Sequence, residues 1–392
     1  MTLTIVWHKP CWFASQSPTG FASRGCLGHP GFGGLPREVE VLSELFDSTR
    51  IVGPCYATGD PTGEIAITGK NISMIALTWL HRSPWLTWVV LPFWFCRNGL
   101  RLIQEISKSD AVYVFIPSPI GLLGLILGLA FRKPILARQL NKWSESRRLW
   151  RFERAFLEKI TGGKNVVFAT GASEEAPSSR NPEICWLFIT SITQRELASI
   201  RRIRAPSVRL IMIGRVVETL GTLTVLRALP LLSRQFPEVH LDVVGDLPLP
   251  SELKHVAQDS NVFGRVTFHG SPGRQRIVEL LREADVFCCV PGAETEHYRQ
   301  ALHEALACGL PVVTSSTEIA PMLMRKGCAI VLKEETPTAL AEAVMDCLSD
   351  SDRYVRMSGE ALRTAQEYSL ERWRETVRCA LENAWGPLRS VQ

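Results

Sequence analysis

Short apolar runs alternate along the chain with longer amphipathic segments, the pattern of strands and helices in an α/β protein. The alternation is most regular in the second half. Strands are expected there at 208–213, 239–244, 266–269, 285–290, 312–315 and 329–332. Helices are expected at 222–235, 251–258, 274–283, 299–308, 337–348, 352–368 and 370–384. Strands joined by helical crossovers predict a Rossmann-like parallel sheet.

The first half shows the same alternation less cleanly. Strands are expected at 3–7, 111–116, 134–140, 166–169 and 185–189, with helices at 36–46 and 150–160. The segment 199–207, SIRRIRAPS, is basic and polar and contains a proline, as expected of a boundary between domains. We therefore expect a Rossmann-like domain over 1–200, a second over 201–369 and a C-terminal helix over 370–392.

Two apolar stretches invite comparison with membrane spans. The first covers 75–80 and 85–96, interrupted by HRSP, and the second covers 120–131. Each uninterrupted run is shorter than the roughly 20 residues that a spanning helix needs. Buried helices of an α/β core explain both stretches. The alternative for the first is a membrane-interface segment, because it combines basic side chains with many aromatic ones. These aromatic residues are Trp79, Trp85, Trp88, Phe93, Trp94 and Phe95.

Composition narrows the function classes. The chain has 392 residues, 46% of them hydrophobic and 21% charged, as in an ordered protein of two domains. The net charge of +5 is modest and no domain is basic throughout, so we expect no nucleic-acid partner, whereas an anionic membrane surface is compatible. The 11 cysteines include no CxxC pair, which favours reduced thiols. The N-terminus lacks the pattern of a signal peptide, so we expect a cytoplasmic protein, with membrane association at the cytoplasmic face.

One strand–loop–helix segment, 285–311, carries candidate chemistry. Glu296 lies in the expected loop, and Glu304 lies in the expected helix that Gly309 ends. Ligands of such folds bind at the carboxyl ends of the strands, where a helix N-terminus favours phosphate. One carboxylate could accept hydrogen bonds from sugar hydroxyls and the other could hold a ribose diol. The spacing alone fits two solvated surface charges equally well.

The run E-x7-E followed by ALACGLPVV resembles the signature of the retaining, nucleotide-sugar-dependent glycosyltransferases of family 4, the group 1 glycosyl transferases. Four more segments resemble this family in the same order: MIGRVVETLG, LDVVGDLP, VTFHGSP and READVFCCVP. The resemblance covers 208–348 and is weaker over 1–200. It implies the GT-B fold, in which two Rossmann-like domains face a central cleft and the C-terminal helices cross back to the first domain.

The resemblance also implies roles for single residues. Arg215 matches the arginine that binds the donor diphosphate, Glu296 the glutamate that faces the donor sugar, and Glu304 the one that holds the ribose. Gly33 and Gly34 match a glycine turn that lets the backbone approach the phosphates. Arg215 and Glu296 are the expected catalytic residues. The rest of the expected donor site consists of Gly214, His269, Gly270, His297, Tyr298 and Arg299.

The chain departs from the family pattern at several of these positions. Leu220 stands where the family has a lysine, and the usual E-G-F-G reads EHYR at 296–299. The later G-G-x-P-E is also replaced, at 317–322. The acceptor-domain histidine has no match, with Arg138, Asn141 or Trp143 at the expected strand end. Loss of a charge-assisted contact to the diphosphate would cost roughly 1.5–3 kcal/mol, and we expect Arg299 to supply the missing charge.

The expected function is transfer of a sugar, with retention, from a nucleotide-sugar donor to a saccharide or lipid-linked acceptor in polysaccharide or glycoconjugate biosynthesis. No metal or other cofactor is expected, since His297 and His303 lack a third ligand. A non-catalytic glycosyltransferase-like subunit or scaffold is one alternative, motivated by Leu220 and the altered loop. A sugar-nucleotide epimerase is another. A dehydrogenase is disfavoured, because Pro36 occupies the place of the third glycine of a dinucleotide fingerprint.

Overall fold

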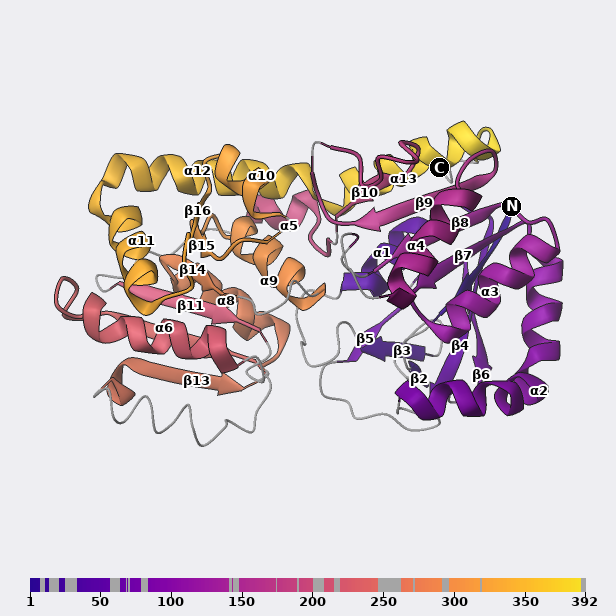
Figure 1. Cartoon of the computed structure of the whole chain (residues 1–392), viewed down its shortest axis with the longest axis horizontal. Coiled ribbons are helices and arrows are strands. Elements are labelled where there is room, and N and C mark those ends of the chain that lie inside the picture. The colour runs from indigo at the N-terminus through magenta and orange to yellow at the C-terminus, as the bar shows by residue number, and fades with distance from the viewer. Residues whose placement is uncertain are drawn as a thin grey trace. The chain divides into compact units, whose positions relative to one another are not determined.

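The computed structural model resolves the chain into two compact units (Figure 1). The first contains Met1–Gly25, Leu35–Phe188 and Glu371–Gln392, and the second contains Cys26–Gly34 and Ile189–Leu370. The residues described are 1–7, 11–13, 21–24, 34–56, 64–67, 69, 71–78, 84–140, 143, 148–173, 175–188, 190–199, 208–214, 219–245, 262–270, 272–290, 296–317 and 319–388.

The first unit is built on a parallel sheet. Its order is β6 (Ile72–Leu77), β4 (Ser48–Tyr56), β1 (Thr2–Val6), β7 (Ala111–Ile116), β8 (Ile135–Gln139), β9 (Asn165–Thr170) and β10 (Cys185–Leu187). The chain moves outward from β1 to β6, returns to β7 and continues to β10, so the strand order reverses between β1 and β7. The short strands β2 (Cys11–Phe13), β3 (Phe21–Arg24) and β5 (Glu64–Ala66) extend the sheet from the end of β4.

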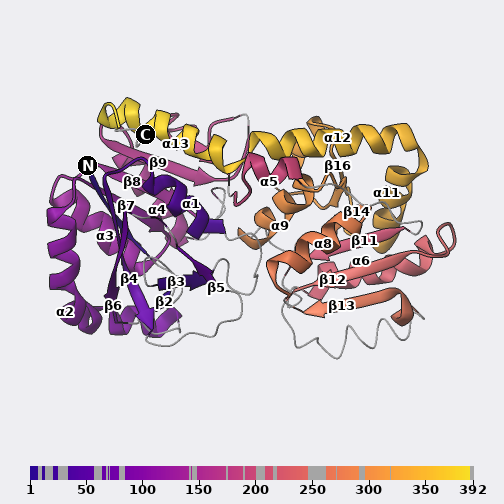
Figure 2. The same ribbon diagram turned by 180° about the vertical axis from the view of Figure 1, so that it is seen from behind.

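Helices cover both faces of this sheet. On one face lie α2 (Pro84–Lys108), α3 (Pro119–Ala130) and α4 (Arg148–Ile160), and on the other lie α1 (Gly34–Ser43) and α13 (Leu370–Trp385). Trp373, Val377 and Leu381 of α13 share a core with Leu3 and Ile5 of β1. Both views show α13 along this unit (Figure 1, Figure 2). The C-terminal helix therefore returns to the first unit, as the resemblance implied.

The two apolar stretches have different outcomes. The second forms α3, whose glycines let it approach the sheet: a Cβ on Gly124 would lie 2.7 Å from Val6, and one on Gly128 would lie 2.5 Å from Ile135. The expectation of a core helix at 120–131 is confirmed. A helix at 75–80 is wrong, because this run belongs to β6 and pairs in parallel with β4. No helix in the described part of the chain combines the length and apolar composition needed to cross a bilayer.

The second unit has a six-stranded parallel sheet. Its order is β13 (Val266–Gly270), β12 (His240–Val244), β11 (Arg209–Ile213), β14 (Val286–Cys289), β15 (Val312–Thr314) and β16 (Ala329–Val331). Its helices are α5 (Gln194–Ser199), α6 (Thr219–Leu232), α8 (Arg274–Glu283), α9 (Glu296–Ala307), α10 (Ala320–Arg325), α11 (Pro337–Ser349) and α12 (Ser351–Glu367). This is the strand order of the Rossmann fold. The helix expected at 251–258 lies outside the described residues.

Candidate functional site

The expected donor site lies at the carboxyl edge of the second sheet. β11 and β14 are parallel neighbours, and the strand order reverses between them. The helices α6 and α9 begin after these two strands, so both N-termini lie at the switch point of the sheet. Free backbone N–H groups at two helix N-termini create a local positive potential that suits the phosphates of a nucleotide.

Backbone hydrogen bonds tie the neighbouring strand ends together. The N–H of Gly214 donates to the carbonyl of Val244 at 3.0 Å, and the N–H of Gly245 donates to the carbonyl of Gly270 at 2.7 Å. Gly270 has a φ of 65°, which favours glycine over any residue with a Cβ. The structure thus places Gly214 and Gly270 at the edge where the sequence predicted them.

Gly221, the second glycine of the MIGRVVETLG segment, lies at the start of α6. A Cβ at this position would lie 1.9 Å from the carbonyl oxygen of Val290, at the end of β14. The glycine therefore lets the first turn of α6 pack directly on the strand that leads to α9. This close approach brings the two helix N-termini to the same point of the sheet.

The helix α9 begins at Glu296, three residues before the predicted start at Arg299. The placement of Glu296 in a loop is therefore wrong. The residues 296–299 include no glycine or proline, so nothing in this stretch opposes helix formation, and a carboxylate in a first turn interacts favourably with the helix dipole. The side chains of Glu296, His297 and Tyr298 lie outside the described part of the chain, as do Arg215 and Gly33.

Glu304 is fully buried, with 0% of its surface exposed, so its interpretation as a solvated surface charge is wrong. Gln300, one turn earlier, donates from Nε2 to Glu304 Oε1 at 3.0 Å. A buried carboxylate is costly unless hydrogen bonds satisfy it, and Gln300 meets part of this need. Sequence reasoning missed Gln300, although its spacing of four residues from Glu304 could have indicated the pair. Burial, with the nearby charge of Glu304, raises the pKa of Cys308 to about 12.

Arg299 lies in the first turn of α9 and is 1% exposed. Its side chain is therefore buried inside the second unit. This position keeps a positive charge near the start of α9. The expectation that it replaces the lysine missing at Leu220 stays a prediction.

A buried carboxylate next to His269 was not predicted. Asp242 of β12 is 0% exposed and its Oδ1 lies 2.7 Å from Nε2 of His269, while its Oδ2 lies 3.0 Å from Nη2 of Arg209. Burial alone would raise the pKa of Asp242, but the hydrogen bond from His269 and the charge of Arg209 together hold it below its usual value. The carboxylate orients the imidazole of His269 one residue before Gly270, at the edge predicted to meet the nucleotide base.

Gly34, the residue before the first unit resumes at Leu35, opens α1 with a φ of 26°, a conformation that favours glycine. Arg138 lies next to the last residue of β8, at the strand end where the sequence placed it. It is buried within β8 and forms an ion pair with Glu38 of α1. Its Nε donates to Oγ1 of Thr170 at 3.3 Å, and its Nη2 donates to the carbonyl of Phe188 at 3.3 Å. Arg138 thus has a structural role in linking α1 to the sheet, and Trp143 is likewise buried.

Residues 194–364 match the family model described as "Glycosyl transferases group 1". A GDP-mannose-dependent alpha-(1-6)-phosphatidylinositol monomannoside mannosyltransferase of Mycolicibacterium smegmatis is 31% identical over 176 residues, which cover 43% of this chain and 45% of the relative. The chain thus spans about half the length, or less, of the curated relatives that it matches.

Solved structures match almost the whole chain. HepE of Anabaena, solved in complex with UDP and glucose, has a TM-score of 0.66 and 15% identity, with 97% of this chain and 99% of HepE covered. WaaG, a glycosyltransferase involved in lipopolysaccharide biosynthesis, has a TM-score of 0.61 and 15% identity, with 99% and 100% covered. The fold is therefore that of the GT-B glycosyltransferases. Residues 194–364 match the group 1 glycosyl transferases, so the resemblance expected over 208–348 is confirmed for this part of the chain.

Proposed function

We propose that the chain is a glycosyltransferase that moves a sugar from a nucleotide-sugar donor to a saccharide or lipid-linked acceptor with retention. The observation that carries the proposal is the buried carboxylate of Glu304, held by Gln300 inside the matched domain. A carboxylate accepts both hydrogens of a ribose diol, and the two helix N-termini at the switch point offer N–H groups to the diphosphate.

In the proposed reaction, the bond between the anomeric carbon and the diphosphate oxygen breaks while the acceptor hydroxyl oxygen bonds to the same face of that carbon. The acceptor proton leaves with the nucleoside diphosphate. Negative charge grows on the departing oxygen, so Arg215 and the N-termini of α6 and α9 stabilise the transition state more than the ground state. Glu296 would orient the donor sugar. The proposal requires no metal or other cofactor.

The donor base and sugar can be identified by comparing the binding of several nucleotides and nucleotide sugars. The M. smegmatis relative is named as GDP-mannose-dependent, and HepE was solved with UDP and glucose, so the panel consists of GDP, UDP and ADP with GDP-mannose and UDP-glucose. A nucleotide that binds the native state raises the unfolding midpoint. Stabilisation by one nucleoside diphosphate supports the donor site, and no stabilisation by any of them contradicts it.

Turnover separates this proposal from its alternatives. Release of nucleoside diphosphate that depends on an added saccharide or lipid-linked acceptor is expected of a transferase. Nucleotide binding without release under any acceptor would favour a non-catalytic subunit. Conversion of the donor to an epimeric sugar nucleotide without an acceptor would favour an epimerase. The anomeric configuration of the product, read by NMR, tests retention.

A peripheral contact with an anionic membrane at the cytoplasmic face is a second proposal, and the exposed side chains of α2 support it. Trp94, in the predicted segment 75–96, is buried and donates from Nε1 to the carbonyl of Thr78 at 2.7 Å. Phe93, which belongs to the same predicted segment, and Leu100 lie on the outward stripe of α2 and are 76% and 74% exposed. The exposed basic residues of this stripe are Arg97, Arg101 and Lys108.

Apolar and basic side chains on one helix face are typical of a helix that lies in the interface. Cosedimentation with phosphatidylglycerol vesicles tests the contact. The double variant Phe93→Ser with Leu100→Ser is expected to bind less, and Val355→Ser, at an exposed apolar position of α12 in the second unit, is the control. Equal binding of wild type and double variant would contradict the contact.

A further inference from the structure

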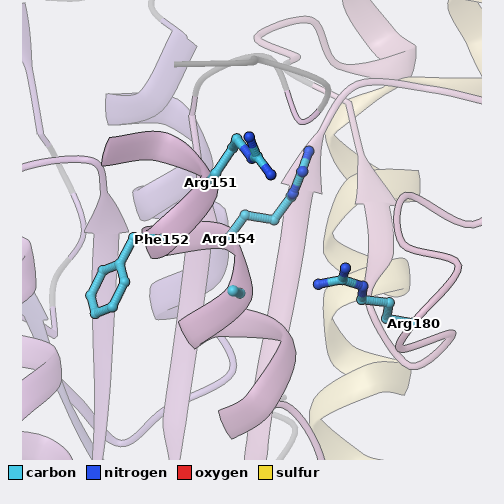
Figure 3. Close-up of a pocket in the computed structure, with 5 residues that line it drawn as sticks. Arg151, Phe152, Arg154 and Arg180 are labelled. Atoms are coloured by element: carbon cyan, nitrogen blue, oxygen red, sulfur yellow. The ribbon is translucent and has the colours of Figure 1, made fainter. Parts of the chain in front are cut away.

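A cationic cavity lies on the first unit, and none of the residues that line it belongs to the expected donor site. It has a volume of about 330 Å³ and is lined by Arg151, Phe152, Arg154, Ala155 and Arg180 (Figure 3). The first two turns of α4 supply four of these residues, and the segment between β9 and β10 supplies Arg180. In Figure 3 the three guanidinium groups point toward the same space, whereas the ring of Phe152 points away from them.

The three guanidiniums are only partly neutralised. Arg180 lies 3.7 Å from Glu158 and remains 78% exposed, and the second oxygen of Glu158 accepts a hydrogen bond from Ser178 at 2.7 Å. Arg154 donates to the carbonyl of Trp143 at 2.8 Å, which is a neutral partner. Among the described residues, Arg151 makes no hydrogen bond or ion pair. Within the described part of the chain, one carboxylate, that of Glu158, thus pairs with one of the three arginines.

Clustered guanidiniums repel one another, and a bound oxyanion relieves this repulsion. Arginine also presents its N–H groups as a planar fork that matches two oxygens of a phosphate. The cavity is large enough for a phosphoryl group and its ester substituent, and no acidic side chain is among the described residues that line it. Its chemistry therefore favours an anionic ligand.

The position of the cavity connects it with the substrate of the first unit. α4 follows β8, so its first turns begin at the carboxyl edge of the parallel sheet, the edge where such folds bind ligands. The donor residues predicted from the sequence belong to the second unit, whereas the residues that line the cavity belong to the first. The cavity thus shares no residue with the expected donor site.

We propose that Arg151, Arg154 and Arg180 form a binding site for a phosphoryl group carried by the acceptor. The inference rests on the proposed glycosyltransferase function, because it assigns part of the acceptor. The phosphoryl group belongs either to a lipid headgroup or to a water-soluble sugar phosphate, and both present the same oxygens to the arginines.

The test uses the full chain with its nucleotide site filled by whichever nucleoside diphosphate stabilises it. Inorganic phosphate is then titrated by calorimetry at constant ionic strength, with chloride as the reference. The double variant Arg151→Gln with Arg180→Gln is compared with Lys159→Gln, which removes one charge from an exposed position of α4 that does not line the cavity. Phosphate affinity is expected to fall by about tenfold or more in the double variant, because it loses two charged contacts to the phosphate. In Lys159→Gln the phosphate affinity is expected to stay unchanged.

Vesicles identify the source of the phosphoryl group. Weaker binding of the double variant to phosphatidylglycerol vesicles, with no such loss for phosphatidylcholine, would assign a lipid headgroup. Phosphate binding that the double variant loses without any change in vesicle binding would assign a water-soluble acceptor. Equal phosphate affinity of wild type and double variant, or no preference of wild type for phosphate over chloride, would overturn the proposal. Absence of nucleotide binding would instead contradict the proposed function, and the phosphate titration can still be read without nucleotide.

Discussion

The variant Glu304→Gln tests the nucleotide site most directly. The substitution keeps the shape of the side chain and a hydrogen-bond acceptor for Gln300, which lies 3.0 Å from the carboxylate, but removes the negative charge. A hydrogen bond to a charged group contributes about 1.5–3 kcal/mol, whereas one between neutral groups contributes about 0.5–1.5 kcal/mol. Two ribose hydroxyls donating to Glu304 therefore predict that the variant binds nucleoside diphosphate roughly tenfold or more weakly.

Calorimetry with a ribonucleoside diphosphate and its 2′-deoxy analogue makes the test specific for the ribose. Wild type is expected to prefer the ribonucleotide, and Glu304→Gln is expected to lose most of that preference. The control is Glu342→Gln on α11, an exposed carboxylate of the same unit. The unfolding midpoint without ligand reports whether the fold survives the substitution.

Full burial of Glu304 makes this prediction demanding. A ribose reaches a carboxylate with 0% exposure only if neighbouring side chains move when the nucleotide binds. If they do not move, Glu304 is a structural residue of α9 and the variant keeps both its nucleotide affinity and its preference for ribose. That pair of results would refute the assignment.

Three further predictions concern the same unit. Gly221→Ala is expected to lower the free energy of unfolding in urea by about 1–3 kcal/mol, because its Cβ would lie 1.9 Å from the carbonyl oxygen of Val290. A Cβ on Gly359 of α12 would meet nothing within 4 Å, so Gly359→Ala should not destabilise the protein. Equal effects of the two substitutions would contradict the packing argument. Burial lowers the pKa of His303 from 6.5 to about 4. The stability that the neutral His303 contributes is therefore present above pH 6.5 and is lost as the pH falls toward 4. Denaturation curves of His303→Asn should depend less on pH over this range, and an unchanged pH dependence would count against this role of His303. Arg299→Met is expected to weaken nucleoside diphosphate binding, measured by calorimetry against Arg227→Met, an exposed arginine of α6, and undiminished affinity would show that Arg299 does not replace the missing lysine.

The strands of the second unit were predictable because a parallel strand buried on both faces is a continuous apolar run. The prediction 208–213 became β11, Arg209–Ile213, and the prediction 285–290 became β14, Val286–Cys289. In contrast, β4 was missed although it has nine residues, because Gly53 and Pro54 interrupt its apolar pattern. A Cβ on Gly53 would lie 2.7 Å from Cβ of Trp7, so this glycine serves a close approach between neighbouring strands that no local pattern reveals.

The buried charges could not be predicted from the sequence, because each depends on a partner distant along the chain. Arg138 and Glu38 are 100 residues apart. Asp242 and His269 are separated by 27 residues and meet only because β12 and β13 pair in parallel. Periodicity shows which face of an element is apolar, but a charge on that face reveals nothing about its partner. The ion pair between Arg138 and Glu38 was missed for this reason.

The arrangement of the second sheet bears on the missing lysine. Leu220 belongs to α6 and Arg299 to α9, so the two positions lie on different helices. These helices follow β11 and β14, which pair directly through Leu210 with Val286. A positive charge moved from the start of α6 to the start of α9 therefore remains at the same switch point of the sheet. The predicted replacement of the lysine by Arg299 would thus change which helix supplies the charge and leave the expected position of the diphosphate unchanged, as a functional donor site requires.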